Sequence, residues 1–198
     1  MNDILGTTSP TPRKKYFIGF ALSGREKDAF DGLREKISKE FGVRGALSSP
    51  PHVTLFRPFE TTDVEPLLPG LEKLAGESVA FTVALTKFAA FGDMVWFVEP
   101  EQDRRLFELK ERIGATVAQS IGARESGFLR PPHFHVTLAY KDVFPAVHGR
   151  IGEFLKSEPL PIGSLTVDNI TLFGLKSDGG IWEPVNFFSL RNPSEPRG

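Results

Sequence analysis

The chain has 198 residues, and its 24 lysines and arginines almost balance 25 aspartates and glutamates, for a formal net charge of -1. Apolar residues make up 40% and charged residues 25%, which is typical of a folded globular protein and excludes a largely disordered or coiled-coil chain. The absence of cysteine excludes disulfides, thiolate nucleophiles and cysteine-ligated metals. A charge near zero argues against a protein that coats duplex nucleic acid. Because the polar N-terminal residues do not resemble a secretory signal, we expect a cytoplasmic protein.

The two halves of the chain show the same order of helical and strand-like patterns. Residues 16–22 form an apolar, aromatic run typical of a buried strand, and apolar residues recur every three or four positions over 25–41, which predicts a helix. The same criteria predict, in chain order, a strand at 52–56, a helix at 64–74, strands at 79–91 and 94–98, a helix at 106–121, a strand at 135–140, a helix at 144–155, and strands at 165–175 and 181–190. Within the helix at 144–155, we expect His148 on the solvated face.

Three pairs of landmarks recur in the same order and at nearly equal separations. They are His52 and His135, Phe91-Gly92 and Phe173-Gly174, and Trp96 and Trp182. We therefore expect two copies of one α/β unit, related by a pseudo-twofold axis.

The two copies share the tetrapeptide His-Val-Thr-Leu, at 52–55 and at 135–138. Side chains alternate along a strand, so the His and Thr of each motif share one face while the Val and Leu share the other. If the polar faces turn inward, two imidazoles and two hydroxyls converge on one cleft. One imidazole could then take a proton from water while the other protonates a leaving alkoxide, and the hydroxyls could bind phosphate oxygens. This chemistry requires no metal.

These paired motifs resemble the HxTL motifs of the two-histidine (2H) phosphoesterase superfamily, which includes the 2′-5′ RNA ligase family and RNA 2′,3′-cyclic phosphodiesterases. The resemblance covers nearly the whole chain and implies an α+β, bilobal fold in which antiparallel sheets line a central cleft. It implies hydrolysis of 2′,3′-cyclic phosphate ends of RNA, or of small cyclic nucleotides, to 2′-phosphates without metal or cofactor. By this resemblance, His52 is the proton donor, His135 is the proton acceptor, and Thr54 and Thr137 bind the phosphate.

The resemblance also sets the expected domain limits and partners. We expect one bilobal domain at 15–192, a flexible segment at 1–14 and a tail at 193–198. The expected partners are RNA cyclic phosphate ends or cyclic nucleotides, with no membrane and no obligate protein partner.

The second motif leaves a choice between two histidines. Alignment on the preceding prolines selects His133, whereas alignment on His-Val-Thr-Leu selects His135, which we choose because only it has a threonine two positions later. The His133-Phe134-His135 spacing is also typical of metal ligands in a strand, but the nearby sequence supplies only Asp142 as a further ligand. We therefore expect no metal site.

Other residues near the motifs are candidates for substrate binding. Arg57 and Arg130 could neutralise substrate phosphates, and Tyr140 could stack on a base. Two further functions stay open: a nucleotide- or RNA-binding module with little turnover, and 2′-5′ RNA ligation. Ligation driven by ATP has no support, because no phosphate-binding P-loop motif is present.

Overall fold

The computed structural model describes residues 12–125, 132–176 and 180–194, and all ranges below refer to them. The strands are β1 (Lys14–Ala21), β2 (His52–Thr61), β3 (Phe81–Phe91), β4 (Val95–Pro100), β5 (Val136–Ala139), β6 (Ser164–Val167), β7 (Asn169–Leu175) and β8 (Trp182–Ser189). The helices are α1 (Gly24–Phe41), α2 (Leu68–Glu77), α3 (Arg104–Ile121) and α4 (Pro145–Ser157), with short 3-10 turns η1 (Gly45–Ser48) and η2 (Glu65–Leu67). The predicted elements are thus present with shifts at their ends, apart from the strand predicted at 165–175, which is divided in two.

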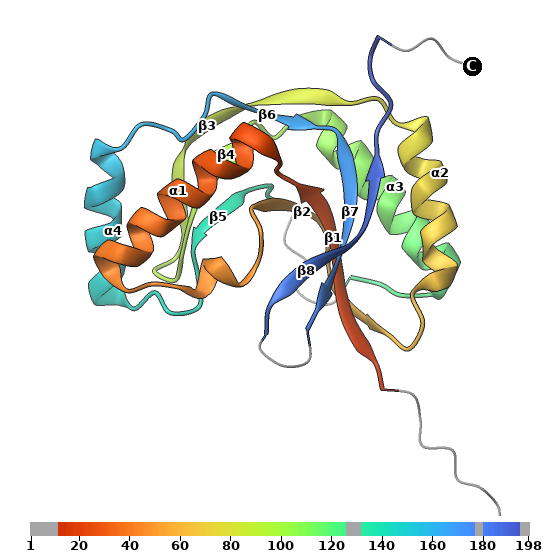
Figure 1. Ribbon diagram of the computed structural model, residues 1–198, viewed down its shortest axis with the longest axis horizontal. Coiled ribbons are helices and arrows are strands. Elements are labelled where there is room, and N and C mark those ends of the chain that lie inside the picture. The colour runs from red at the N-terminus through yellow and green to blue at the C-terminus, as the bar shows by residue number, and fades with distance from the viewer. Residues whose placement is uncertain (1–11, 126–131, 177–179, 195–198) are drawn as a thin grey trace, which may run out of the picture.

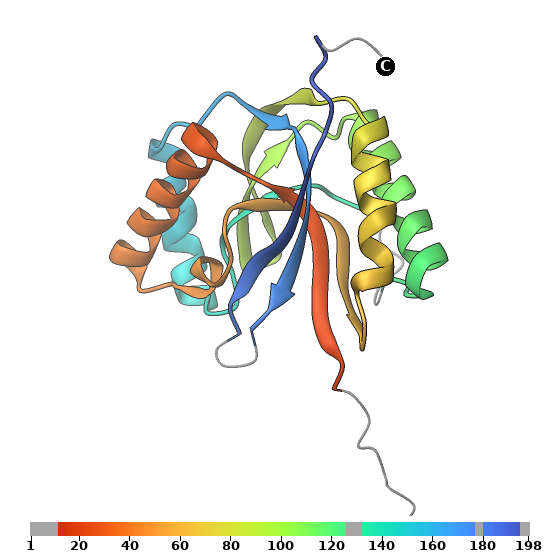
Figure 2. The ribbon, with the colours of Figure 1, turned by 45° about the vertical axis from the view of Figure 1, so that its right-hand side comes forward.

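The described strands form one curled, antiparallel sheet in the order β6-β3-β4-β5-β2-β1-β7-β8. At its centre, β2 and β5 meet where Val53 pairs with Val136, so the two motif strands are neighbours. Helices α1 and α4 cover one half of the sheet, and α2 and α3 cover the other (Figure 1). The same two helix pairs flank the sheet in the turned view (Figure 2). The fold is therefore bilobal, as predicted.

The repeated unit is strand-helix-strand-helix-strand. The last strand of each unit lies in the other lobe, where it pairs with the first strand of the other unit. The first unit runs from β1 to β3 and the second from β4 to β7, with β6 and β8 outside the repeat. Strand β3 pairs with β4, the first strand of the second unit, and β7 pairs with β1, the first strand of the first unit. Equivalent strands therefore lie at equal distances on either side of the β2–β5 contact, and a pseudo-twofold axis through this contact relates the two lobes.

The prediction that Trp96 and Trp182 are equivalent was wrong. Trp96 lies on β4, whose counterpart across the axis is β1, whereas Trp182 lies on the edge strand β8. The Trp96 indole donates its N–H to the His148 carbonyl on α4, 3.1 Å away, while the Trp182 ring contacts Phe17. Their similar spacing to the motifs therefore does not reflect a shared position in the sheet.

The single strand predicted at 165–175 is two strands. Ser164–Val167 pairs with β3 in one lobe, and Asn169–Leu175 pairs with β1 in the other. The break is fixed by the fully buried Asn169, whose amide group donates to the Ala21 carbonyl at 2.9 Å and accepts from the Ala21 N–H at 3.0 Å. This side chain takes the place of a ladder partner where the chain crosses between lobes.

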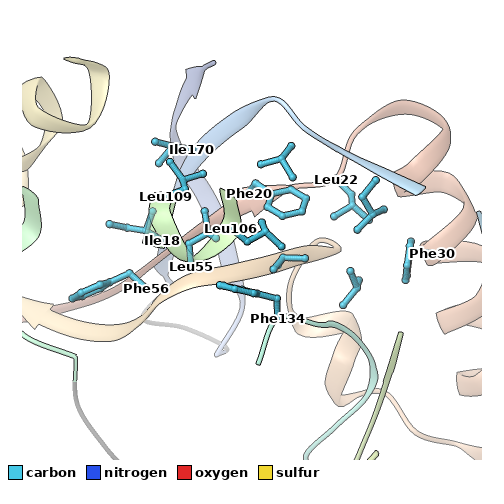
Figure 3. Packing of buried hydrophobic residues seen from close by; sticks show 14 of the residues in the cluster. Ile18, Phe20, Leu22, Phe30, Leu55, Phe56, Leu106, Leu109, Phe134 and Ile170 are labelled. Atoms are coloured by element: carbon cyan, nitrogen blue, oxygen red, sulfur yellow. The ribbon is translucent and has the colours of Figure 1, made fainter. Parts of the chain in front are cut away.

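The core lies between the sheet and the helices. Helix α3 buries one stripe at three- or four-residue spacing, as the sequence predicted, and this stripe packs beneath β2, next to its neighbour β1. Figure 3 shows its residues Leu106 and Leu109 beside Ile18 and Leu55 of those strands. Because alternate strand residues fill this core, the residues between them project to the opposite face of the sheet. That opposite face carries the motif histidines.

Candidate active site

A cavity of about 520 Å³ opens where the two lobes meet. Both histidines and both threonines of the motifs line it, while the Val and Leu residues of the same motifs are buried in the core. The walls come from both lobes and include the side chains of Lys15, Phe17, Ser48, Ser49, Phe91, Tyr140, Lys141 and Trp182. The alternation along β2 and β5 therefore brings two imidazoles and two hydroxyls to one space.

The two imidazoles are held in the same way. The Nδ1 atom of His52 lies 2.8 Å from the Pro50 carbonyl oxygen, and Nδ1 of His135 lies 2.7 Å from the His133 carbonyl oxygen. Because a carbonyl oxygen can only accept, each Nδ1 must carry the hydrogen. In the neutral rings, Nε2 is then an unprotonated acceptor, and it is the nitrogen left for a ligand in the cavity.

Each imidazole also packs against a pair of phenylalanines. Around His52 these are Phe17 of β1 and Phe173 of β7, with ring centroids 4.7 and 5.2 Å away. Around His135 they are Phe97 of β4 and Phe91 of β3, at 5.1 and 5.0 Å. Strands β1 and β4 are equivalent in the repeat, as are β7 and β3. The whole frame of each histidine is thus repeated across the axis.

Burial lowers the proton affinity of both rings. Desolvation is the main cause that lowers the pKa of His52 to about 4, and the positive charge of Arg34 adds to it against the opposing hydrogen bond to Pro50. Desolvation also lowers the pKa of His135; the hydrogen bond to the His133 carbonyl opposes this effect, and the His133 side chain adds a smaller lowering contribution. Both imidazoles are therefore neutral at pH 7 when the cavity holds no anion.

Hydrogen bonds join the segment before the first motif, at Arg44 and Gly45, to the segment after the second motif, at Asp142. The carboxylate of Asp142 accepts hydrogen bonds from the backbone N–H groups of Arg44, at 2.7 Å, and Gly45, at 3.1 Å. Position 45 must be glycine, because a Cβ atom there would lie 1.8 Å from the Tyr140 carbonyl oxygen. The wall formed by η1 is thus fixed relative to the second histidine.

The remaining predicted residues take different places. Tyr140 lies at the cavity rim, 44% exposed, with the Lys141 ammonium 5.4 Å from its ring centroid. Arg57 lines an adjoining cavity of about 380 Å³ that shares Thr54 and His135 with the first. Arg130 lies outside the described residues.

His133 is also beside this adjoining cavity. Its Nε2 lies 3.6 Å from a Glu99 carboxylate oxygen, and Phe91 and Phe97 contact its ring.

Within the described ranges, no three metal-binding side chains of the His, Asp and Glu types come together. None of the helices described is both long and apolar enough to span a bilayer.

The expectation for His148 was wrong. Its ring stacks on Trp96, with centroids 4.8 Å apart and an angle of 23° between the planes, and its Nε2 is buried without a hydrogen-bond partner among the described residues. Helix α4 approaches β4 this closely because Gly152 faces the indole, where a Cβ would lie 2.8 Å from the ring. Sequence spacing identified the helix but not the side that meets the sheet.

Sequence reasoning missed one charged residue of the site, Arg34. It is 2% exposed and lies on α1 at helical spacing from the core residues Phe30 and Ile37. An arginine within an otherwise apolar helical stripe was the available signal, because a buried guanidinium needs fixed acceptors.

The fold and the paired histidine-threonine motifs are those of the two-histidine phosphoesterase superfamily. Two solved structures share the fold: TT0787 of Thermus thermophilus, with a TM-score of 0.62 and 22% identity, and E. coli LigT in complex with 3′-AMP, with a TM-score of 0.61 and 21% identity. Each comparison covers 90% of this chain and 99% of the other.

Sequence comparison gives the family. The family model of the 2′-5′ RNA ligase superfamily matches residues 25–179, and the chain belongs to this superfamily. A proposed phosphoesterase of Geobacillus sp. (strain WCH70) is 27% identical over 139 residues, which cover 66% of this chain and 75% of that protein.

Proposed function

We propose that the protein is a cyclic phosphodiesterase that hydrolyses 2′,3′-cyclic phosphates, at RNA ends or on small nucleotides, to 2′-phosphates. The observation that carries this proposal is the repeated geometry of the imidazoles, each of which has Nδ1 committed to a carbonyl and Nε2 left for the cavity. Hydrolysis of a phosphodiester needs one proton acceptor and one proton donor on opposite sides of phosphorus. Two equivalent rings facing one cavity meet that need.

In the proposed reaction, His135 acts first as the base. Its neutral Nε2 takes a proton from water as the water oxygen forms a bond to phosphorus. The bond from phosphorus to the 3′ oxygen breaks, and protonated His52 gives its Nε2 proton to that oxygen. The hydroxyls of Thr54 and Thr137 donate hydrogen bonds to the nonbridging oxygens, whose charge grows in the transition state. The product carries a 2′-phosphate and a free 3′ hydroxyl.

The low pKa of His52 fits the donor role once substrate is bound. A cyclic phosphate is an anion, and a negative charge beside Nε2 favours the imidazolium form. An imidazolium with a low intrinsic pKa is a strong acid, which transfers its proton readily to an alkoxide. Binding of the phosphate thus both protonates His52 and places the proton where it is used.

Two features of the cavity favour a nucleotide as the substrate. The exposed ring of Tyr140 at the rim offers a stacking surface for a base, and Lys15 and Lys141 place positive charge on the walls. E. coli LigT, which has the same fold, has been solved with 3′-AMP. A nucleotide in this cavity would place its phosphate at the histidines.

The test is incubation of the purified protein with 2′,3′-cyclic AMP in the presence of EDTA, followed by phosphorus NMR. The proposal predicts conversion to the 2′-phosphate, unaffected by the chelator. Protection of the protein from thermal unfolding without turnover would instead identify a nucleotide-binding module. Activity that depends on added Mn²⁺ or Zn²⁺ would contradict the two-histidine mechanism. A 3′-phosphate product would mean that the two histidines exchange roles.

A further inference from the structure

The guanidinium of Arg34 connects the two motifs from inside the core. Its Nε donates to the Thr137 carbonyl oxygen at 2.8 Å, and one Nη donates to the Ser49 carbonyl oxygen at 3.1 Å. Ser49 precedes Pro50, whose own carbonyl holds Nδ1 of His52. A single side chain therefore links the loop that orients His52 to the strand that carries Thr137.

The side chain that links the two motifs is charged, although burying a neutral side chain there would have a smaller desolvation penalty. Arg34 is 2% exposed, and among the described residues its hydrogen-bond acceptors are carbonyl groups, so dipoles solvate most of its charge while the Asp31 carboxylate acts on it from a distance. The carboxylate of Asp31, one turn earlier on α1, forms its own salt bridge with Lys27. Burial lowers the pKa of Arg34 to about 10, which still leaves the side chain charged at neutral pH.

We propose that Arg34 is a positioning residue of the two-histidine site: it sets the relative placement of the motif strands and holds a positive charge beside His52. This inference rests on the proposed function. The first effect fixes the distance between Nε2 of His52 and the Thr137 hydroxyl. The second adds to the effect of burial, which is the main cause of the low pKa of His52, and so further disfavours the imidazolium form until an anion enters.

Other charges also act on His52 and must be considered with Arg34. His135, immediately before β5, also lowers the pKa of His52 through its charge when protonated. Lys15 of β1 and Lys141 after β5 line the same cavity, but Lys15 also pairs with Glu60 at 3.3 Å, and both are open to solvent. Arg34 differs because it is buried, so solvent and salt screen its charge far less.

The experiment compares R34M, which removes the charge, with R34K, which keeps the charge but cannot reproduce the fork of two hydrogen bonds. R112M is the matched control, because Arg112 on α3 binds Ser78 and Glu77 away from the cavity. The His52 ring is titrated by NMR without substrate, its signal being assigned from its loss in H52N. The rate of 2′,3′-cyclic AMP hydrolysis is then measured against pH.

In R34M, the titration midpoint of His52 should move upward, because the imidazolium no longer faces a positive charge. Its kcat should fall by about 10²-fold, the loss expected when reacting groups are displaced by about 1 Å. In R34K, the midpoint should stay near that of the wild type while kcat still falls. The control R112M should change neither quantity.

A folded R34M with the wild-type midpoint and kcat would overturn the proposal. If R34M does not fold, R34K tests the proposal. An unchanged kcat in R34K would show that the two hydrogen bonds of Arg34 do not position the catalytic groups, and would overturn the proposal. Failure of the wild type to hydrolyse any 2′,3′-cyclic phosphate would contradict the proposed function instead. The His52 midpoint would then still test whether Arg34 acts on this ring.

Discussion

The two histidines have the same frame but different surroundings. Each ring bonds through Nδ1 to a carbonyl two residues upstream and lies between phenylalanines from equivalent strands. Only His52 is affected by a buried arginine, and only His135 has a second histidine two residues before it. The duplicated fold thus supplies two equivalent nitrogens, and burial together with unmatched neighbouring charges lowers the pKa of His52 to about 4 and also lowers that of His135. A pair that must act as acid and base needs this combination of symmetry and difference.

The largest expected effect comes from removing either ring. His52→Asn and His135→Asn should each lower kcat for 2′,3′-cyclic AMP by about 10² to 10⁴, the usual contribution of a positioned acid or base. Circular dichroism of each variant shows whether it is folded. Retention of wild-type kcat by one folded variant would mean that its histidine is not part of the pair.

The threonines test the symmetry more closely. Thr54→Val and Thr137→Val keep the side-chain shape and remove the hydroxyl, and each should lower kcat by about 10², as expected for loss of one donor to the transition state. The steady-state rates of both variants should fall by similar factors. A loss confined to one of them would show that the phosphate contacts only one lobe.

His133 tests the choice made within the second motif. His133→Ala should lower kcat by less than about tenfold, because its Nε2 faces Glu99 and its ring borders the adjoining cavity. The comparison with His135→Asn uses the same substrate and pH. Equal losses would assign the second catalytic role to His133.

The smallest effect is on stability. Because the folded-state pKa of His52 is lowered to about 4, the unfolded chain binds the extra proton first as the pH falls below about 6.5. The free energy of unfolding should therefore decrease from pH 7 to pH 5, with His52 contributing about 2 kcal/mol of the change. Urea unfolding of H52N should show a weaker pH dependence than the wild type. An identical dependence would show that His52 is not desolvated.

The sequence was sufficient where local patterns decide the structure. The motif strands, the amphipathic helices and the facing of His52 and Thr54 away from the core follow from spacing alone. It was insufficient where distant segments meet. The expected equivalence of Trp96 and Trp182 failed because β4 and β8 do not hold corresponding places in the sheet, and the burial of Arg34 depends on carbonyls that are 15 and 103 positions away in the chain. No local pattern contains such contacts.

The most direct test of the whole account is a crystal structure of H135N soaked with 2′,3′-cyclic AMP. The account predicts the phosphorus atom between Nε2 of His52 and the position that His135 Nε2 occupies in the wild type. The hydroxyls of Thr54 and Thr137 should lie within hydrogen-bond distance of the nonbridging oxygens. A nucleotide bound with its phosphate outside the cavity shared by the two motifs would contradict the central claim that both lobes act on one phosphate.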